Sequence, residues 1–153
     1  MFRGRENDVI PVCEELGIGF VPWSPLGMGT LCGYVDERTR FNNPPEKDLK
    51  TIIPRFSEQA MKHNLALYQM IDRFAKEKGC TTAQFALAWL QAQKPFIVAI
   101  PGTTKGYHLL ENLGATDITF TTKELIQYRN ALDSFTVEGL RLPEMILNFS
   151  EVR

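Results

Sequence analysis

Residues 96–105, FIVAIPGTTK, decide the predicted fold of this 153-residue chain. The first five are apolar with no polar alternation, which is typical of a parallel strand covered by helices on both faces. The turn from Pro101 to Lys105 follows and leads into an expected helix. A second apolar run, IGFVP at 18–22, leads into the glycine-containing loop WSPLGMG at 23–29. The two stretches together predict βα units of a parallel α/β fold.

Helices are expected around both runs, because a capping residue precedes each helical pattern and glycine follows most of them. The helices are predicted over about 9–16, 58–78, 83–93, 106–113 and from 122 onward. The expected N-terminal caps are Asp8, Ser57, Thr81 or Thr82, and Thr121 or Thr122. The expected terminating glycines are Gly17, Gly79 and Gly114. Residues 34–56 are expected to be irregular, and residues 136–153 to form an apolar tail. A small α+β domain is the plainer interpretation. Two or three βα units of a longer array explain the wholly apolar strands better, since two parallel strands alone make a poor sheet.

Composition restricts the class of protein. Hydrophobic residues make up 44% and charged residues 23%, and the formal net charge is -1, so no basic field for nucleic acid is present. Three cysteines without a CxxC pair argue against a disulfide framework or a zinc site. The apolar runs are far shorter than a membrane span. These features predict a cytoplasmic protein without metal, nucleic-acid or membrane partners.

The two loops that follow the predicted strands are the candidate binding segments, because function in βα arrays gathers at the carboxyl ends of the strands. Gly102 allows close approach of a ligand, Thr103 and Thr104 offer hydroxyls, Lys105 a cation, and the next helix its free N–H groups. Trp23 offers a flat apolar surface. Either loop alone is more often structural than functional. Together they suit a nucleotide, which has both rings and phosphates.

Several stretches, in this order, resemble the aldo-keto reductases. They are EELGIGFVPWSPLGMG at 14–29, PRF at 54–56, AQFALAWL at 83–90, IVAIPGTTK at 97–105, HLLENLG at 108–114 and VEGLR at 137–141. The resemblance implies a (β/α)8 TIM barrel that transfers hydride between NADPH and a carbonyl compound. This chain, 1–153, would be one partial domain, the C-terminal half of that barrel, with parallel strands and covering helices.

The resemblance also implies a site for the cofactor NADP(H). Trp23 would stack on the nicotinamide, where the family usually has tyrosine. Lys105 would meet the 2′-phosphate, and His108 stands where the family often has arginine or glutamine. The remaining assignments are Ser24, Leu26 and Gly27 along the pyrophosphate, Pro25 as a further cofactor-binding residue, Gly102, Thr103 and Thr104 at the adenosine end, and Glu111 and Asn112 at the adenine.

The family's catalytic aspartate, tyrosine, lysine and histidine have no match in this chain, and no residue is predicted to be catalytic. The four tyrosines fall in the wrong segments, and His63 lies inside a predicted helix. We therefore expect a truncated NADP(H)-dependent oxidoreductase that keeps the cofactor corner and is inactive alone. Two alternatives stay open. The chain could be a non-enzymatic half-barrel module that self-associates or pairs with another chain, or a fragment with its parent's function. The sequence does not identify a substrate.

Overall fold

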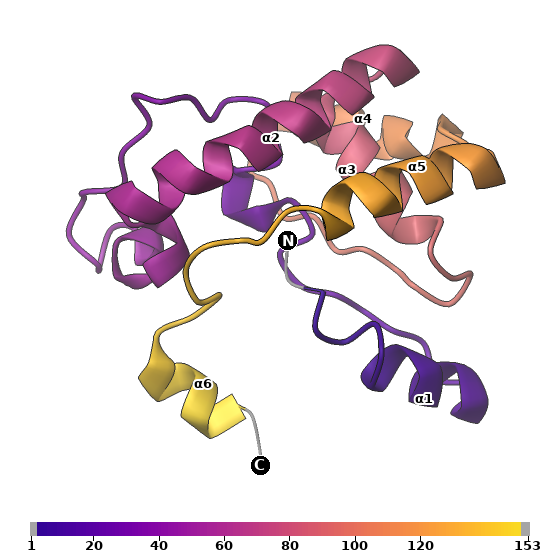
Figure 1. Ribbon diagram of the computed structural model, residues 1–153, viewed down its shortest axis with the longest axis horizontal. Coiled ribbons are helices and arrows are strands. Elements are labelled where there is room, and N and C mark those ends of the chain that lie inside the picture. The colour runs from indigo at the N-terminus through magenta and orange to yellow at the C-terminus, as the bar shows by residue number, and fades with distance from the viewer. Residues whose placement is uncertain (1–2, 151–153) are drawn as a thin grey trace.

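The computed structural model describes residues 3–150 as a helical protein (Figure 1). The α-helices are α1 (Val9–Leu16), α2 (Glu58–Lys78), α3 (Thr82–Gln91), α4 (Gly106–Leu113), α5 (Thr122–Asp133) and α6 (Glu144–Ser150). Short 3-10 turns occur at η1 (Gly27–Gly29), η2 (Leu49–Ile52), η3 (Pro54–Phe56) and η4 (Gly114–Asp117). Figure 1 shows α2, α3, α4 and α5 gathered together, with α1 and α6 apart from them. No helix within residues 3–150 is long and apolar enough to cross a bilayer.

The helix ends follow the local chemistry that the sequence predicted. Thr81 and Thr121 each form a reciprocal capping box with the residue three positions later. Ser57 accepts a hydrogen bond from the Ala60 amide at 3.3 Å at the start of α2. Gly79 ends α2 in the left-handed conformation with a φ of 74°, which glycine adopts at little cost.

The two predicted strands are corrected by the structure. Within residues 3–150 the runs 18–22 and 96–100 form no strand, only one isolated parallel bridge between Phe20 and Ile97. Its two hydrogen bonds run from the Phe20 amide to the Phe96 carbonyl and from the Val98 amide to the Phe20 carbonyl, both at 2.9 Å. The runs are therefore neighbours and parallel, as the βα interpretation requires, but the predicted half-barrel is not confirmed.

The predicted burial of these runs on both faces is also wrong. Ile18 is 50% exposed and Val98 is 58% exposed, whereas Ile97 is buried. The physical reason is that a parallel strand is buried by neighbours at both edges and by helices on both faces. Here, among the described residues, the only backbone hydrogen bonds that either run makes to a segment distant in sequence are the two to the other run.

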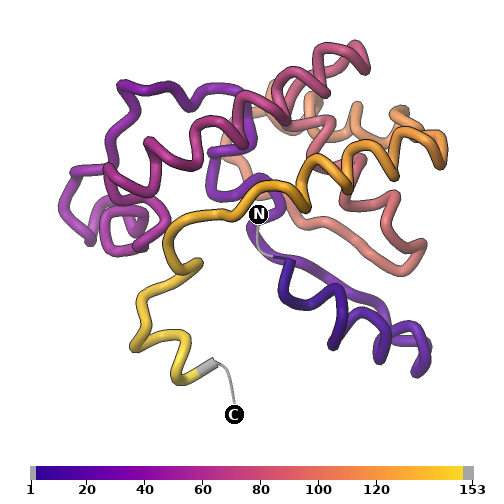
Figure 2. Tube along the Cα trace, in the orientation of Figure 1, coloured from indigo at the N-terminus to yellow at the C-terminus, as the bar shows by residue number. Residues whose placement is uncertain are grey.

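The main core lies between α2, α3 and α5. Phe85 of α3 meets Tyr128 of α5 edge to face with ring centroids 5.1 Å apart, and Phe74 of α2 lies 4.6 Å from the same tyrosine. A smaller core of Leu87, Ala88 and Ala115 joins α3 to η4. Residues 34–56 form an irregular excursion beside the start of α2, as Figure 2 shows, with η2 and η3 at its end. This architecture brings Leu26 and Gly29 of the loop 23–29 close to Gly102, Thr103 and α4.

Candidate functional site

The first candidate segment, the loop 23–29, is a tight turn with an unusual backbone. Ser24 and Met28 have φ values of 50° and 56°, in the left-handed region that non-glycine residues rarely adopt. The Gly27 amide donates to the Ser24 carbonyl at 2.9 Å, and the Gly29 amide donates to the Leu26 carbonyl at 3.0 Å. Trp23 is 54% exposed, so its ring is not a core side chain. The loop therefore leaves the Trp23 ring accessible to a ligand.

The second candidate segment, residues 101–105, connects the Ile97 region to α4. The Lys105 amide donates to the Thr103 hydroxyl at 3.1 Å, which shapes the entry to the helix. Gly102 has open space where a side chain would begin, so crowding within the described residues does not explain the glycine. Thr104 and Lys105 are exposed. The turn thus leaves an amide-rich helix start and a cation accessible to an anion.

The structure brings six of the predicted cofactor residues to one cavity of about 220 Å³: Leu26, Gly102, Thr103, His108, Glu111 and Asn112. The other residues around it are Gly29, Cys32, Tyr34 and Ala83. The cavity therefore lies between the end of the first loop, the second turn and α4.

Asn112 is a buried polar residue in the wall of this cavity. The residue is only 8% exposed, yet its amide makes no hydrogen bond with any other group of residues 3–150. It is not among the buried polar atoms that are sealed off from solvent without a partner. A buried amide is normally hydrogen-bonded, so a free donor and acceptor that open on a cavity indicate a place for a ligand.

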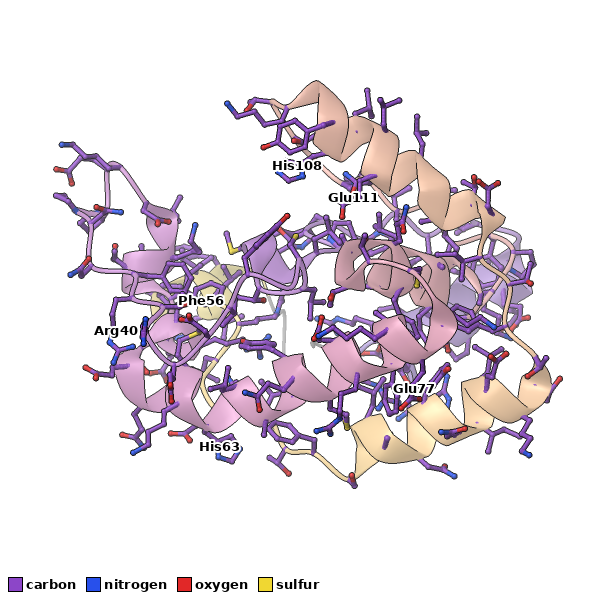
Figure 3. The ribbon with its side chains drawn as sticks, turned by 90° about the horizontal axis from the view of Figure 1, so that it is seen from above. Arg40, Phe56, His63, Glu77, His108 and Glu111 are labelled. Atoms are coloured by element: carbon purple, nitrogen blue, oxygen red, sulfur yellow. The ribbon has the colours of Figure 1, made fainter. Side chains whose placement is uncertain are left out.

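His108 and Glu111 form the charged side of the cavity. The His108 Nδ1 atom lies 3.2 Å from the Glu111 Oε2 atom, one helical turn apart on α4. Figure 3 shows both side chains pointing from α4 toward the body of the molecule. The His108 ring also packs against the Tyr107 ring with centroids 4.3 Å apart. Burial, together with the negative charge of Glu111, raises the pKa of the nearby Cys32 thiol.

Sequence reasoning missed the residue that holds this part of α4 in place. The Gln84 side chain of α3 completes the Thr81 capping box through its Oε1 atom, and its Nε2 atom donates to the Glu111 carbonyl at 3.0 Å. The capping-box pattern could have identified the first contact, but the second is non-local. One side chain thus fixes the distance between α3 and the Glu111–Asn112 pair.

The other predicted residues lie elsewhere. Trp23, Ser24, Pro25 and Gly27 line a larger hollow of about 1,030 Å³, with walls supplied by apolar side chains such as Phe20, Phe74 and Trp89. Thr104 and Lys105 line neither space. The predicted nicotinamide side and the predicted adenosine side therefore face two different cavities, with Leu26 on the second.

Comparison with known proteins matches residues 1–133 to the family described as Aldo/keto reductase family. A glycerol dehydrogenase from Gluconobacter oxydans has a similar structure, with a TM-score of 0.78 and 22% identity over 91% of this chain. Two structures of aldo-keto reductase from Klebsiella pneumoniae, one with NADPH and one with NADP and acetate, give TM-scores of 0.56 and 0.58 at 24% identity over 92% of this chain. At these identities the likeness concerns the fold. This chain spans 41%, 38% and 39% of the lengths of those three proteins.

Proposed function

This chain belongs to the aldo/keto reductase family, and from that premise we propose that residues 1–153 form the C-terminal half-barrel that holds NADP(H). The observation that carries the proposal is the cavity beside α4, where six residues assigned to the cofactor lie together. The solved relatives from Klebsiella pneumoniae contain NADPH or NADP, which supports the choice of ligand.

The side chains of the cavity suit the adenosine end of the cofactor. Asn112 offers a free amide donor and acceptor to the base, and Glu111 accepts a hydrogen bond beside it. Thr103, Thr104 and the start of α4 offer hydroxyl and amide donors to phosphate, and Lys105 is an exposed cation for the 2′-phosphate. On the other side of Leu26, Ser24, Pro25 and Gly27 would follow the pyrophosphate toward the ring of Trp23.

In the proposed reaction, this chain binds the cofactor and residues outside it supply the proton donor. The bound cofactor supplies a hydride to a carbonyl carbon, and the substrate is a carbonyl compound. The residues of this chain bind and orient the cofactor. A proton donor for the carbonyl oxygen is proposed to come from outside residues 1–153, since neither His63 nor His108 has the required setting: His63 lies on the exposed side of α2, and His108 is engaged with Glu111. We accordingly expect no turnover from this chain alone. Its three free cysteines suit a reducing compartment such as the cytoplasm.

A fluorescence titration of the purified chain with NADPH, beside NADH, tests the proposal. Saturable binding that favours NADPH is expected. Lys105→Met should raise the Kd of NADPH by roughly two- to fivefold, the range for one exposed ion pair, and leave NADH unchanged. Lys123→Met, which removes an exposed lysine of α5, is the matched control. No binding at millimolar NADPH would refute the assignment, and steady reduction of an aldehyde by the pure chain would refute the division of the chemistry.

The exposed apolar runs favour a second candidate function, self-association or pairing with a complementary half-barrel. Val21 is 56% exposed and Val98 is 58% exposed, and each directly follows a residue of the parallel bridge. Unpaired edges of extended runs invite pairing with another chain. Sedimentation velocity should show a dimer that Val98→Lys dissociates, whereas Val12→Lys, at a 50% exposed position of α1, should leave it intact. A wild-type monomer at high concentration would exclude this function.

A further inference from the structure

Tyr34 is an exposed tyrosine at the cavity beside α4. The residue is 74% exposed and lines the cavity, and it makes no hydrogen bond or ring contact with the other described residues. It opens the irregular excursion at 34–56, where no periodic pattern marks it in the sequence. An aromatic ring at the wall of a small cavity, with no hydrogen bond or ring contact to other described residues, is available to a ligand.

The backbone before Tyr34 is held in place. Gly33 has a φ of 78°, and a side chain added there would meet the Thr82 hydroxyl at 3.0 Å. That hydroxyl donates to the Asp72 Oδ1 atom at 2.9 Å, which joins the start of α3 to α2. Gly33 therefore packs closely on α3, and the tyrosine that follows it starts from a fixed point.

The size and chemistry of the cavity restrict the ligand. At about 220 Å³ the cavity is smaller than pockets for whole drug-sized ligands, roughly 300–1,000 Å³, so it takes one ring system of a larger molecule. Two ring-bearing side chains, Tyr34 and His108, line it from different segments. The free amide of Asn112 offers one donor and one acceptor, the pair that asparagine presents to the edge of adenine.

We propose that Tyr34 stacks on the adenine base of the bound nucleotide and is a binding residue of the adenosine pocket. This rests on the proposed function and adds to it a residue from a segment that contributed no predicted contact. Base–aromatic stacking acts through the flat face of the ring. The hydroxyl of Tyr34 is therefore dispensable and its ring is required.

Isothermal titration of the full chain with adenosine 2′,5′-bisphosphate tests this inference. Tyr34→Ala should raise the Kd by roughly 5- to 150-fold, the range for loss of one stacked base. Tyr34→Phe should bind like the wild type. Tyr34→Leu, which keeps apolar bulk without a flat face, should bind nearly as weakly as the alanine variant. Because Tyr34 is 74% exposed and belongs to no described core cluster, all three variants should keep the wild-type circular dichroism spectrum.

Titration of the same variants with reduced nicotinamide mononucleotide distinguishes a loss of adenine stacking from a general loss of cofactor binding. Tyr34→Ala should leave this adenine-free half of the cofactor unaffected. Equal loss for both probes, wild-type affinity in Tyr34→Ala, or wild-type affinity in Tyr34→Leu each overturns the stacking role and leaves the cofactor site standing. If the wild type binds NADPH but not the bisphosphate, the adenosine pocket and the role of Tyr34 both fail. No binding of any nucleotide overturns the proposed function together with the inference.

Discussion

Gly114 contacts the Gln84 side chain, and this contact can be tested with one substitution. Gly114→Ala should destabilise the protein when Gln84 is present and stabilise it when Gln84 is replaced by alanine. Gly114 has a φ of -60° and a ψ of -12°, a conformation that alanine adopts without strain. Alanine for glycine at such a position stabilises by about 0.4–1 kcal/mol, because the unfolded chain loses freedom. A Cβ atom at this position would, however, overlap with the Gln84 Nε2 atom. The Gln84 amide must therefore move away.

The displaced Gln84 amide loses two contacts. The bond from its Nε2 atom to the Glu111 carbonyl is worth about 1 kcal/mol, and the reciprocal half of the Thr81 capping box is worth about 0.5–1 kcal/mol. The two losses together exceed the gain at Gly114. We therefore expect Gly114→Ala to destabilise the wild type by about 1 kcal/mol. In the Gln84→Ala background the contacts are already absent, and the same change should stabilise by about 0.4–1 kcal/mol.

Urea unfolding of the four proteins of this double-mutant cycle measures the coupling. Gly106→Ala is the matched control, since Gly106 begins α4, the helix that Gly114 follows, and has open space around it; it should stabilise both backgrounds alike. Gln84→Glu keeps an acceptor for Thr81 but cannot donate to the Glu111 carbonyl, so it isolates the bond between α3 and α4. If Gly114→Ala has the same sign and size in both backgrounds, Gln84 is not the cause and the reasoning is wrong.

Three further results are expected. Asn64→Ala should lower the free energy of unfolding by about 2–4 kcal/mol and expose the tail to proteases, because the buried Asn64 amide bonds both backbone groups of Glu138, at 3.0 and 2.9 Å. The pKa of Glu124 is lowered to about 2, chiefly by its hydrogen bond with the Lys78 ammonium. Glu124 therefore contributes stability that is present above its unfolded pKa and is lost as pH falls toward 2. In Glu124→Gln the free energy of unfolding should depend less steeply on pH in this range. Cys32, whose thiol pKa is raised by burial and by the Glu111 carboxylate, should react slowly with iodoacetamide at neutral pH and faster in a Glu111→Gln variant, as measured by mass spectrometry.

Controls for these three exist on the same chain. Asn130→Ala removes an exposed asparagine of α5 and should leave stability unchanged. Glu15→Gln, at an exposed site of α1, should not alter acid unfolding. A tail that stays protected in Asn64→Ala, an acid transition unchanged in Glu124→Gln, or Cys32 alkylation independent of Glu111 would contradict the respective expectation.

The helix boundaries could be predicted because their causes are local. Ser57 and Thr121 bond to amides within three residues, and Gly79 needs only its own left-handed backbone. Gly114 shows the limit of such reasoning. The sequence predicted the correct end of α4, but the glycine does not act as a left-handed cap, and the chain continues into η4. Its lack of a side chain makes room for Gln84, which is 30 residues away in sequence.

The burial of the two apolar runs could not be predicted because burial depends on neighbours that the runs do not encode. Their composition predicted a fully covered sheet, and the described chain supplies one parallel bridge. The site was predicted in part for a similar reason. Asn112 and Thr103 stand in recognisable motifs, whereas Tyr34 lies in an aperiodic excursion and reaches the cavity only through the packing of Gly33 on α3.

The two halves of the proposed cofactor site differ in how well they are packed. This difference should appear in the relative affinities of the whole cofactor and of its adenosine part. The cavity beside α4 shares Leu26 with the small core of Leu87, Ala88 and Ala115, so this wall of the cavity is held by packing within the described residues. Trp23 is instead half exposed over the larger hollow. We therefore expect adenosine 2′,5′-bisphosphate and NADPH to bind this chain with Kd values that agree within about tenfold, a difference of 1.4 kcal/mol. NADPH binding that is tighter by more than this factor, and weakened by Trp23→Ala, would mean that the nicotinamide side is formed without any further residues.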